Sequence, residues 1–404
     1  MSAPSIPNLL SLRSGAASGR GRGTGPGGPA RRGPPGSRPG PTHDATIQAT
    51  DTDAAVSRLS AVDLGYLDDP FARLFVQGPA TRRLPIINRG TYTRTTAIDA
   101  LVDRFLATTD PDRPRQIVSL GAGTDTRCMR LLTSPHRNHR NLAYHEIDFP
   151  AIMARKQALI ATTPSLRAIL APPVPLSPTA WHAPSLDPAH GNSLNLHGLD
   201  LRTLTPSSPP LPNLDLTAPT LLLSECCLCY LPLPSSSPAP PAPTPLSSTS
   251  PPRPPLPPTP PPPSPILSHF TTHLPSPTPL SLIIYEPILP HDPFGRTMTT
   301  NLAARGIVMP TLSIYPTAAA QEARVRAAGF AEARVRTVDE IWEGWVDAKE
   351  RERADGLEGL DEIEEWRLLA GHYVVVWGWR KIQGGFGCGR GRGMEWRRRW
   401  GDGM

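Results

Sequence analysis

Proline dominates one internal stretch of this chain and limits what the chain can fold into. Of the 34 residues from Pro232 to Pro265, 18 are proline. Because proline lacks a backbone N–H and fixes φ, this stretch predicts neither a helix nor a central strand. We expect a disordered or polyproline insertion at residues 232–265, with a helix resuming over Ile266–His273.

Both ends of the chain predict segments that do not pack into a core. Residues 1–45 are rich in glycine, proline and arginine, and no acidic residue occurs among the first 43. Residues 384–404 are again rich in glycine and arginine. We predict a disordered arm and a disordered tail, with one domain between them at residues 46–383. The composition of the arm is also typical of an organelle transit peptide.

Charge and apolar content exclude several classes of protein. The formal net charge is +6, but the residues up to His43 contribute +6 and those from Lys381 onward +4, so the middle of the chain is about −4. Because the positive charge lies in the tails, we predict no specific nucleic-acid binding. No run of 18 apolar residues occurs, so no membrane-spanning helix is expected.

The five cysteines favour a reducing compartment. Cys226, Cys227 and Cys229 are crowded together, which does not suit a disulfide framework, and they lack the paired spacing of a zinc site. We therefore predict no metal site. We expect the protein in the cytoplasm, with the nucleus as a second compartment, and as a monomer.

Short apolar strands alternate with helices through the middle of the chain. The predicted strands are Gln116–Leu120, Tyr144–Ile147, Pro219–Ser224, Leu280–Tyr285 and Tyr373–Trp379, with a further strand or turn ending at Gly198–Arg202. The predicted helices among them are Asp125–Leu132, Ala151–Ala161, Thr297–Ala304 and Gln321–Ala328. This alternation is typical of an α/β protein with an open, doubly wound, Rossmann-like sheet.

Two helices are predicted ahead of the first strand. One begins with Thr50 or Asp51 as its N-cap and carries apolar residues at three- and four-residue spacing up to Gly65. The other covers Asn88–Ala107 and presents one apolar face. We expect the two to form a helical N-terminal cap on the sheet.

The strongest local motif is Gly121-Ala-Gly123, directly after the first strand. Glycines there let a ligand approach the backbone, and Asp148, at the end of the next strand, can accept both hydroxyl protons of a ribose. A dinucleotide fingerprint needs a third glycine where Thr126 stands. The motif therefore favours a nucleoside without pyrophosphate, such as S-adenosylmethionine, over a dehydrogenase cofactor or a purely structural turn.

Seven motifs, in order over roughly residues 50–380, make the chain similar to one family. They are Asp53-Ala-Ala with Leu64-Gly-Tyr and Asp69-Pro-Phe; Ile87-Asn-Arg-Gly-Thr-Tyr-Thr-Arg94; Leu120-Gly-Ala-Gly-Thr-Asp-Thr126; Glu146-Ile-Asp-Phe-Pro150 with Lys156; Asp200-Leu-Arg202; Leu222-Leu-Ser-Glu-Cys226 with Tyr230; and Tyr285-Glu286 before Phe294-Gly295. The chain resembles the leucine carboxyl methyltransferase family, which methylates the C-terminal leucine carboxylate of the protein phosphatase 2A catalytic subunit.

The resemblance implies a protein C-terminal leucine carboxyl O-methyltransferase with S-adenosylmethionine as cofactor. It implies that Gly121 lies against the cofactor, that Asp148 holds the ribose hydroxyls and that Asp200 with Leu201 borders the adenine. Glu225 would face the methionine amino group. The implied partner is the phosphatase catalytic subunit, bound through its C-terminal tail and active-site face.

The resemblance also implies two catalytic residues and one substituted contact. Arg94 would meet the methionine carboxylate near the substrate carboxylate, and Tyr230 would line the substrate end. Arg58 stands where the family has a lysine, so the charge is kept with a different donor geometry. The residues alone leave other roles open: Glu225 as a buried acid paired with an arginine, Arg94 as a cap or bridge on a helix surface, and Tyr230 as a strand-end aromatic.

The chemistry agrees with this assignment, because a peptide terminal carboxyl with a pKa of about 3.3 to 3.7 is already ionised and needs no general base. Two other functions remain open at this point. A carboxyl methyltransferase of a hypermodified, wybutosine-type tRNA base shares the catalytic domain but typically carries a C-terminal β-propeller. A non-catalytic scaffold would use the proline tract and the tails to bind partners.

Overall fold

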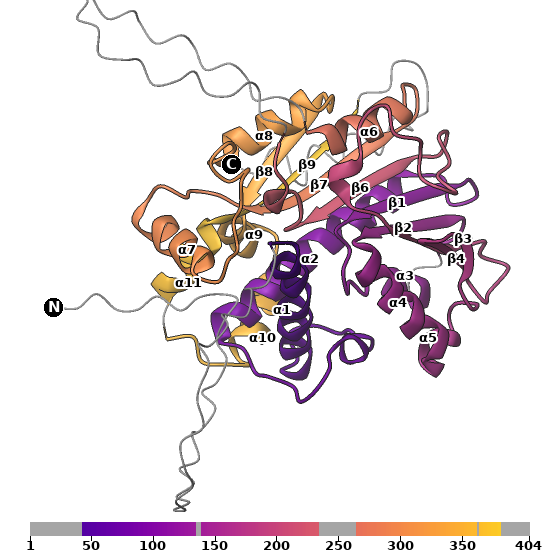
Figure 1. Cartoon of the computed structure of the whole chain (residues 1–404). Coiled ribbons are helices and arrows are strands. Elements are labelled where there is room, and N and C mark those ends of the chain that lie inside the picture. Colours follow the sequence, from indigo (N-terminus) through magenta and orange to yellow (C-terminus); the bar gives the residue numbers. More distant parts are fainter. Residues whose placement is uncertain (1–42, 135–138, 234–263, 362, 381–404) are drawn as a thin grey trace, which may run out of the picture.

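A nine-stranded mixed sheet with helices on both faces forms the centre of the molecule (Figure 1). The computed structural model describes residues 43–134, 139–233, 264–361 and 363–380. Most of the predicted arm, insertion and tail therefore lies outside the described residues. The described chain resumes after the insertion in a helix, Pro265–His273, which confirms the helix expected there.

The strands lie in the order β3-β4-β5-β2-β1-β6-β7-β9-β8. Their bounds are β1 Arg115–Leu120, β2 Leu142–Asp148, β3 Val174–Ser177, β4 Ala180–Pro184, β5 Ser193–Gly198, β6 Thr220–Glu225, β7 Leu280–Pro287, β8 Glu332–Thr337 and β9 Tyr373–Trp379. The five from β5 to β7 pair in parallel, whereas β3, β4, β8 and β9 pair antiparallel at the two edges.

The predicted doubly wound sheet is confirmed, and the strands that sequence reasoning missed lie at an edge of the sheet (β3 and β8) or next to one (β4). The parallel strands are buried almost throughout, so they appear in the sequence as short apolar runs. β3 is largely exposed and β8 alternates charged with small residues, so neither resembles a buried strand. Sequence reasoning for strands therefore worked where both faces of the sheet are covered.

The helices pack on the sheet and at the carboxyl ends of its strands. They are α1 His43–Asp63, α2 Pro85–Thr108, α3 Arg127–Thr133, α4 Pro150–Thr162, α5 Pro164–Arg167, α6 Pro265–His273, α7 Pro293–Ala303, α8 Ala318–Ala327, α9 Val338–Gly344, α10 Ala348–Asp355 and α11 Ile363–Gly371, with short 3-10 turns η1 Ala72–Phe75, η2 Leu201–Thr203 and η3 Leu228–Tyr230. In the described residues, no helix is both long enough and apolar enough to cross a membrane.

The predicted cap of α1 was wrong. The helix begins seven residues before Thr50, at His43, with Asp44 favourably placed in its first turn. Thr50 and Asp51 lie inside the helix, and Asp51 accepts hydrogen bonds from another segment instead. α2 also begins earlier than predicted, at Pro85, because proline is well tolerated in the first turn of a helix.

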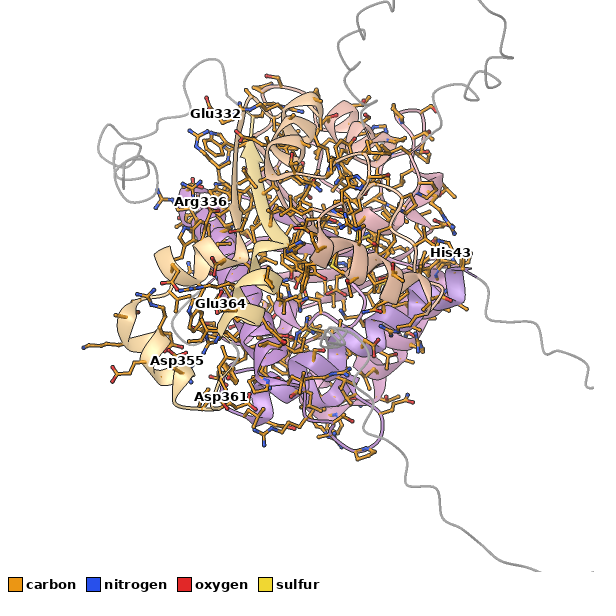
Figure 2. The ribbon with its side chains drawn as sticks, turned by 90° about the vertical axis from the view of Figure 1, so that its left-hand side faces the viewer. His43, Glu332, Arg336, Asp355, Asp361 and Glu364 are labelled. Atoms are coloured by element: carbon orange, nitrogen blue, oxygen red, sulfur yellow. The ribbon has the colours of Figure 1, made fainter. Side chains whose placement is uncertain are left out.

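Two apolar cores lie on opposite faces of the sheet. Consecutive residues of β1 show the division, since Ile117 packs in the core with α2 and α4 whereas Val118 packs in the core with α6 and α8. Figure 1 shows α3 and α4 on one side of the sheet and α6 and α8 on the other. Figure 2, turned by 90°, shows His43 at the start of α1 on the opposite edge of the molecule from Glu332 of β8.

Candidate functional site

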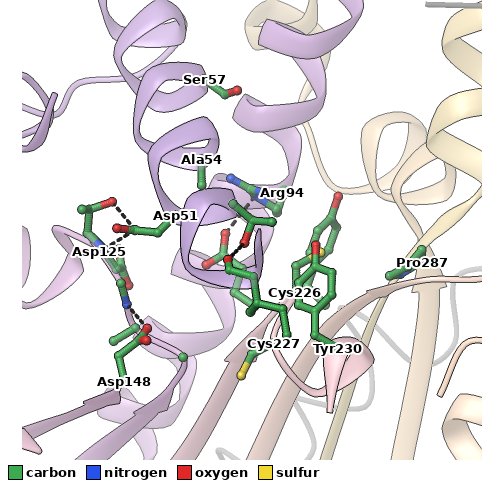
Figure 3. Close-up of a pocket in the computed structure, with 18 of the residues that line it drawn as sticks. Asp51, Ala54, Ser57, Arg94, Asp125, Asp148, Cys226, Cys227, Tyr230 and Pro287 are labelled. Carbon is green, nitrogen blue, oxygen red and sulfur yellow. Dashed lines mark hydrogen bonds and ion pairs between the residues drawn. The ribbon is translucent and has the colours of Figure 1, made fainter. Parts of the chain in front are cut away.

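A cavity of about 220 Å³ lies at the carboxyl ends of the central strands, beneath α1 and α2. The sheet order changes direction there, because β1 has β2 on one side and β6 on the other. All eight of the predicted site residues line this cavity, namely Arg58, Arg94, Gly121, Asp148, Asp200, Leu201, Glu225 and Tyr230. Figure 3 shows labelled side chains from several elements pointing toward one space.

The turn after β1 is shaped by its protein neighbours. Gly121 has φ of +67°, and a Cβ built there would lie 2.4 Å from Cys227 Sγ. Gly123 has φ of +48°, and its Cβ would lie 2.3 Å from Asp51 Oδ1. We expected glycine at these positions because a ligand approaches the backbone. The structure adds two further reasons, since the backbone has positive φ and the side chains of Cys227 and Asp51 leave no room for a Cβ.

Replacement of Gly121 by alanine should destabilise the protein more than the same change at a glycine that has positive φ and open space. Backbone strain and overlap with Cys227 together should lower the free energy of unfolding by about 2 to 4 kcal/mol, measured by urea denaturation. Gly78, with φ of +83° and nothing within 4 Å, is the matched control and should lose only about 1 kcal/mol. Equal losses would show that Cys227 moves aside freely.

Asp148 occupies the end of β2 with both carboxylate oxygens fixed by backbone donors. Gly123 N–H donates to Oδ2 (2.8 Å) and Phe149 N–H donates to Oδ1 (2.7 Å). Burial raises the pKa of Asp148 to about 6, although the two backbone donors favour the ionised form. The carboxylate therefore faces the cavity with lone pairs still available to ligand hydroxyls.

Asp200 and Leu201 lie beside the cavity, where Asp200 also caps η2. Arg202 donates to the carboxylate of Asp200 through Nε (2.9 Å) and Nη2 (2.6 Å). The same guanidinium donates to both oxygens of Asp44 at 2.8 Å. These hydrogen bonds hold the pKa of both carboxyls below the ordinary value. The three residues form a clasp, Asp44–Arg202–Asp200, that ties the first turn of α1 to the loop after β5.

Glu225 ends β6 with one arginine at each carboxylate oxygen. Arg94 Nε lies 2.8 Å from Oε1 as an ion pair, and Arg127 Nη2 donates to Oε2 (3.4 Å). The alternative of a buried acid paired with an arginine is therefore observed, and it coexists with a place in the cavity wall. Among the described residues, Arg94 Nε has no hydrogen-bond partner, so the pair lacks the geometry of a hydrogen bond.

Arg58, on α1, contacts the turn after β1. Its Nη1 donates to the Thr124 carbonyl (3.1 Å) and its Nη2 lies 3.6 Å from Asp125 Oδ1. Asp51, two turns earlier on the same face of α1, accepts from Thr124 N–H and from the Thr124 hydroxyl, both at 2.7 Å. α1 therefore contacts the turn after β1 through one cationic side chain, Arg58, and one anionic side chain, Asp51.

Aromatic side chains form the other end of the cavity. Tyr285 stacks on Tyr373, with ring centroids 5.4 Å apart, and Arg94 lies 5.4 Å from the centre of the Tyr285 ring. Tyr230, on η3, lines the same end. Burial raises the pKa of Tyr230 and Tyr285 well above the ordinary value, so both hydroxyls stay neutral at physiological pH.

Sequence reasoning missed four residues that build this site. They are Asp51, Arg127, Tyr285 and Tyr373. Asp51 was interpreted as a helix cap, and Tyr285 appeared only within a motif. Arg127 follows the glycine turn by four positions, so its charge next to a ligand-binding motif was the available clue.

Comparisons with known proteins bear on this geometry. Residues 46–237 match the family model described as leucine carboxyl methyltransferase. The chain is 45% identical to leucine carboxyl methyltransferase 1 of Aspergillus fumigatus, over 94% of each chain. It is 38% identical to the Yarrowia lipolytica protein of that name over 83% of this chain and 97% of the relative.

A plant relative and a solved structure extend the comparison. The Arabidopsis thaliana homologue is 32% identical over 85% of this chain and 92% of the relative. A solved structure of phosphoethanolamine N-methyltransferase 2 from Haemonchus contortus, in complex with S-adenosyl-L-methionine, aligns with a TM-score of 0.42 and 11% identity, over 85% of this chain and 61% of that chain. That likeness is too low to support an argument.

The close relatives confirm the resemblance seen in the seven motifs. Identity near 45% extends across almost the full length of both chains, including segments outside the cavity. The chain is accordingly a methyltransferase, and its methyl donor is S-adenosylmethionine. The cavity at the carboxyl ends of β1, β2 and β6 is its candidate active site, and the chain belongs to the leucine carboxyl methyltransferase family.

Proposed function

We propose that this chain transfers a methyl group from S-adenosylmethionine to the α-carboxylate of the C-terminal leucine of the protein phosphatase 2A catalytic subunit, forming a methyl ester. The observation that supports it best is the position of Arg94. Its guanidinium lies between the acid Glu225 and the aromatic end of the cavity. From there it can face both the carboxylate of the methyl donor and the carboxylate of the substrate leucine.

The residues present suit the methyl donor. Asp148 offers an ionisable acceptor to two hydroxyls, and Glu225 offers a carboxylate to an ammonium group. Gly121 and Gly123 belong to the cavity wall at the carboxyl end of β1, where such sheets bind nucleosides. Arg94 lines the cavity with its Nε facing Glu225 Oε1 (2.8 Å), so the Nη groups of its planar guanidinium are the donors proposed for a ligand carboxylate.

The reaction needs alignment more than proton transfer. When bound, S-adenosylmethionine supplies an electrophilic sulfonium methyl group. The leucine carboxylate is ionised at neutral pH, so the residues of this chain need only hold it in line and keep water away. Arg94 supplies a planar donor for that alignment. The hydroxyls of Tyr230 and Tyr285 are neutral, so they add no negative charge that would repel the attacking carboxylate.

This substrate implies how the partner protein meets the cavity. We infer that the phosphatase subunit presents its C-terminal tail to the cavity and its active-site face to the surface around it. The roles of Gly121, Asp200, Leu201 and Arg58 beside the cofactor, a monomeric state and a cytoplasmic or nuclear location are part of the same proposal.

A direct assay tests the substrate. The purified chain, incubated with S-adenosylmethionine labelled in its methyl group, should label phosphatase core enzyme and should not label a version that lacks the last leucine. The label should be released by mild base, because a methyl ester hydrolyses there and a methylamine does not. Equal labelling of both versions would exclude the C-terminal carboxylate. Labelling of neither, with cofactor binding intact in calorimetry, would show a different substrate.

A further inference from the structure

Arg127, the first residue of α3, lies outside the cavity wall but contacts its acid. Its side chain is 2% exposed, and each edge of the guanidinium meets a different carboxylate. Nε donates to Asp99 Oδ1 (2.7 Å), Nη1 donates to Asp125 Oδ2 (2.6 Å) and Nη2 donates to Glu225 Oε2 (3.4 Å). These carboxylates come from α2, the turn after β1 and β6.

The contacts of Arg127 belong to a balanced network of buried charges. Four arginines and four acids are linked through pairs within 4 Å, namely Arg58, Arg94, Arg127 and Arg130 with Asp69, Asp99, Asp125 and Glu225. Arg127 is the member that pairs with the most acids in this set. Its removal would leave three carboxylates, Asp125 buried and Asp99 and Glu225 partly buried, each with one cationic partner fewer.

The titration behaviour of the network agrees with a fixed cation at its centre. Burial alone would lower the pKa of Arg127, but Asp125, Asp99 and Glu225 outweigh it and raise that pKa well above the ordinary value. Burial would likewise raise the pKa of Asp99, but Arg130 and Arg127 hold it below the ordinary value. Arg127 therefore stays charged and Asp99 stays ionised at any pH where the protein works.

We propose that Arg127 is a positioning residue, which fixes the Glu225 carboxylate so that it faces the amino group of the methyl donor. Arg94 is expected to face ligand carboxylates, so it cannot alone hold Glu225 in one orientation. Arg127 donates directly to Glu225, and its hydrogen bond to Asp99 attaches it to α2, the helix that also carries Arg94. This role rests on the proposed function, because it assumes the methyl donor in the cavity.

Two nucleosides separate positioning from general destabilisation. S-adenosylhomocysteine carries the amino-acid group that Glu225 would meet, whereas 5′-methylthioadenosine lacks it. In Arg127→Gln, we expect affinity for S-adenosylhomocysteine in calorimetry to fall about tenfold, the loss typical of one displaced charge-assisted hydrogen bond, with affinity for 5′-methylthioadenosine unchanged.

Arg130→Gln is the matched control. Arg130 lies three residues further along α3 and pairs with Asp99 and Asp69, but not with Glu225. It should therefore keep the wild-type ratio of the two affinities, even if thermal unfolding shows a similar loss of stability. An equal loss for both nucleosides in Arg127→Gln, or a changed ratio in Arg130→Gln, would overturn the role of Arg127.

Two more variants complete the test. In a Glu225→Gln background, Arg127→Gln should cause no further change in the ratio, because its effect passes through that carboxylate. Arg127→Lys keeps the charge but lacks the planar fork whose edges meet three separate carboxylates, so it should show an intermediate ratio in folded protein; a wild-type ratio would contradict the proposal. Failure of the wild-type chain to bind either nucleoside would instead overturn the proposed function, and this role with it.

Discussion

Replacement of Arg94 by alanine is expected to lower kcat/KM about a thousandfold, since two charge-assisted hydrogen bonds of about 1.5 to 3 kcal/mol each would be lost in the transition state. One would join Arg94 to the methyl donor and the other to the leucine carboxylate. Methyl transfer to phosphatase core enzyme at subsaturating substrate measures the effect. The loss should appear in kcat as well as KM, because alignment is required at the moment of reaction.

The control for Arg94 must show that removal of a buried arginine alone does not abolish activity. Arg115, 3% exposed at the start of β1, donates to the Leu106 carbonyl (2.8 Å) at the opposite end of that strand from the cavity. Arg115→Ala should reduce stability but retain kcat/KM per folded molecule. Cooperative thermal unfolding of Arg94→Ala should persist, since Arg127 still pairs with Glu225. Unfolded Arg94→Ala would indicate a structural role.

Asp148→Asn is expected to weaken S-adenosylmethionine binding about a hundredfold, because a neutral amide replaces the charged acceptor for two hydroxyls. For the wild-type chain, affinity should be constant above pH 6 and should fall about tenfold per pH unit below it, as protonation removes an acceptor. Calorimetry at pH values from about 5 to about 8 measures both the loss of affinity in the variant and the pH dependence of the wild-type affinity. A flat pH profile would exclude Asp148 as the ribose acceptor.

The same substitution should not destabilise the fold at neutral pH. Because the pKa of Asp148 is raised in the folded protein from 3.8 to about 6, ionisation disfavours folding. The protonated form of Asp148 makes a favourable contribution to the free energy of unfolding that is fully present below pH 3.8. This contribution, about 3 kcal/mol, is lost as the pH rises through 6.

Asparagine removes that cost but forfeits one backbone hydrogen bond, so the free energy of unfolding at pH 7.5 should rise by about 1 to 2 kcal/mol. Urea denaturation at that pH measures the gain, which should shrink at pH 4.5. A variant less stable than wild type at both pH values would contradict this account.

The sequence predicted the residues of the site better than their connections. Gly121, Asp148 and Glu225 each follow a short apolar strand, and parallel strands bring such positions to one edge of a sheet. The pairing of Arg94 with Glu225 could not be predicted, since it depends on how α2 packs over β6. Such contacts are tertiary, and no local pattern encodes them.

The errors have a similar origin. Asp51 has the residue type and position of a helix cap, but its carboxylate bonds to Thr124, 73 residues away in sequence. Arg127 received no role from the sequence, and in the structure three carboxylates from separate elements surround it. The ion-pair and hydrogen-bond partners of charged residues were therefore predicted least well, because those partners are distant in sequence.

The Asp44–Arg202–Asp200 clasp differs from the buried network in its access to dissolved ions. The clasp side chains are between 29% and 43% exposed, whereas Arg127 is 2% exposed. At physiological ionic strength, charges in water are screened over about 8 Å, and buried pairs are screened much less. The first turn of α1, just before the cavity residues Ile47 and Gln48, is therefore held to the loop after β5 by contacts that weaken as salt concentration rises, while the arginines around Glu225 keep their places.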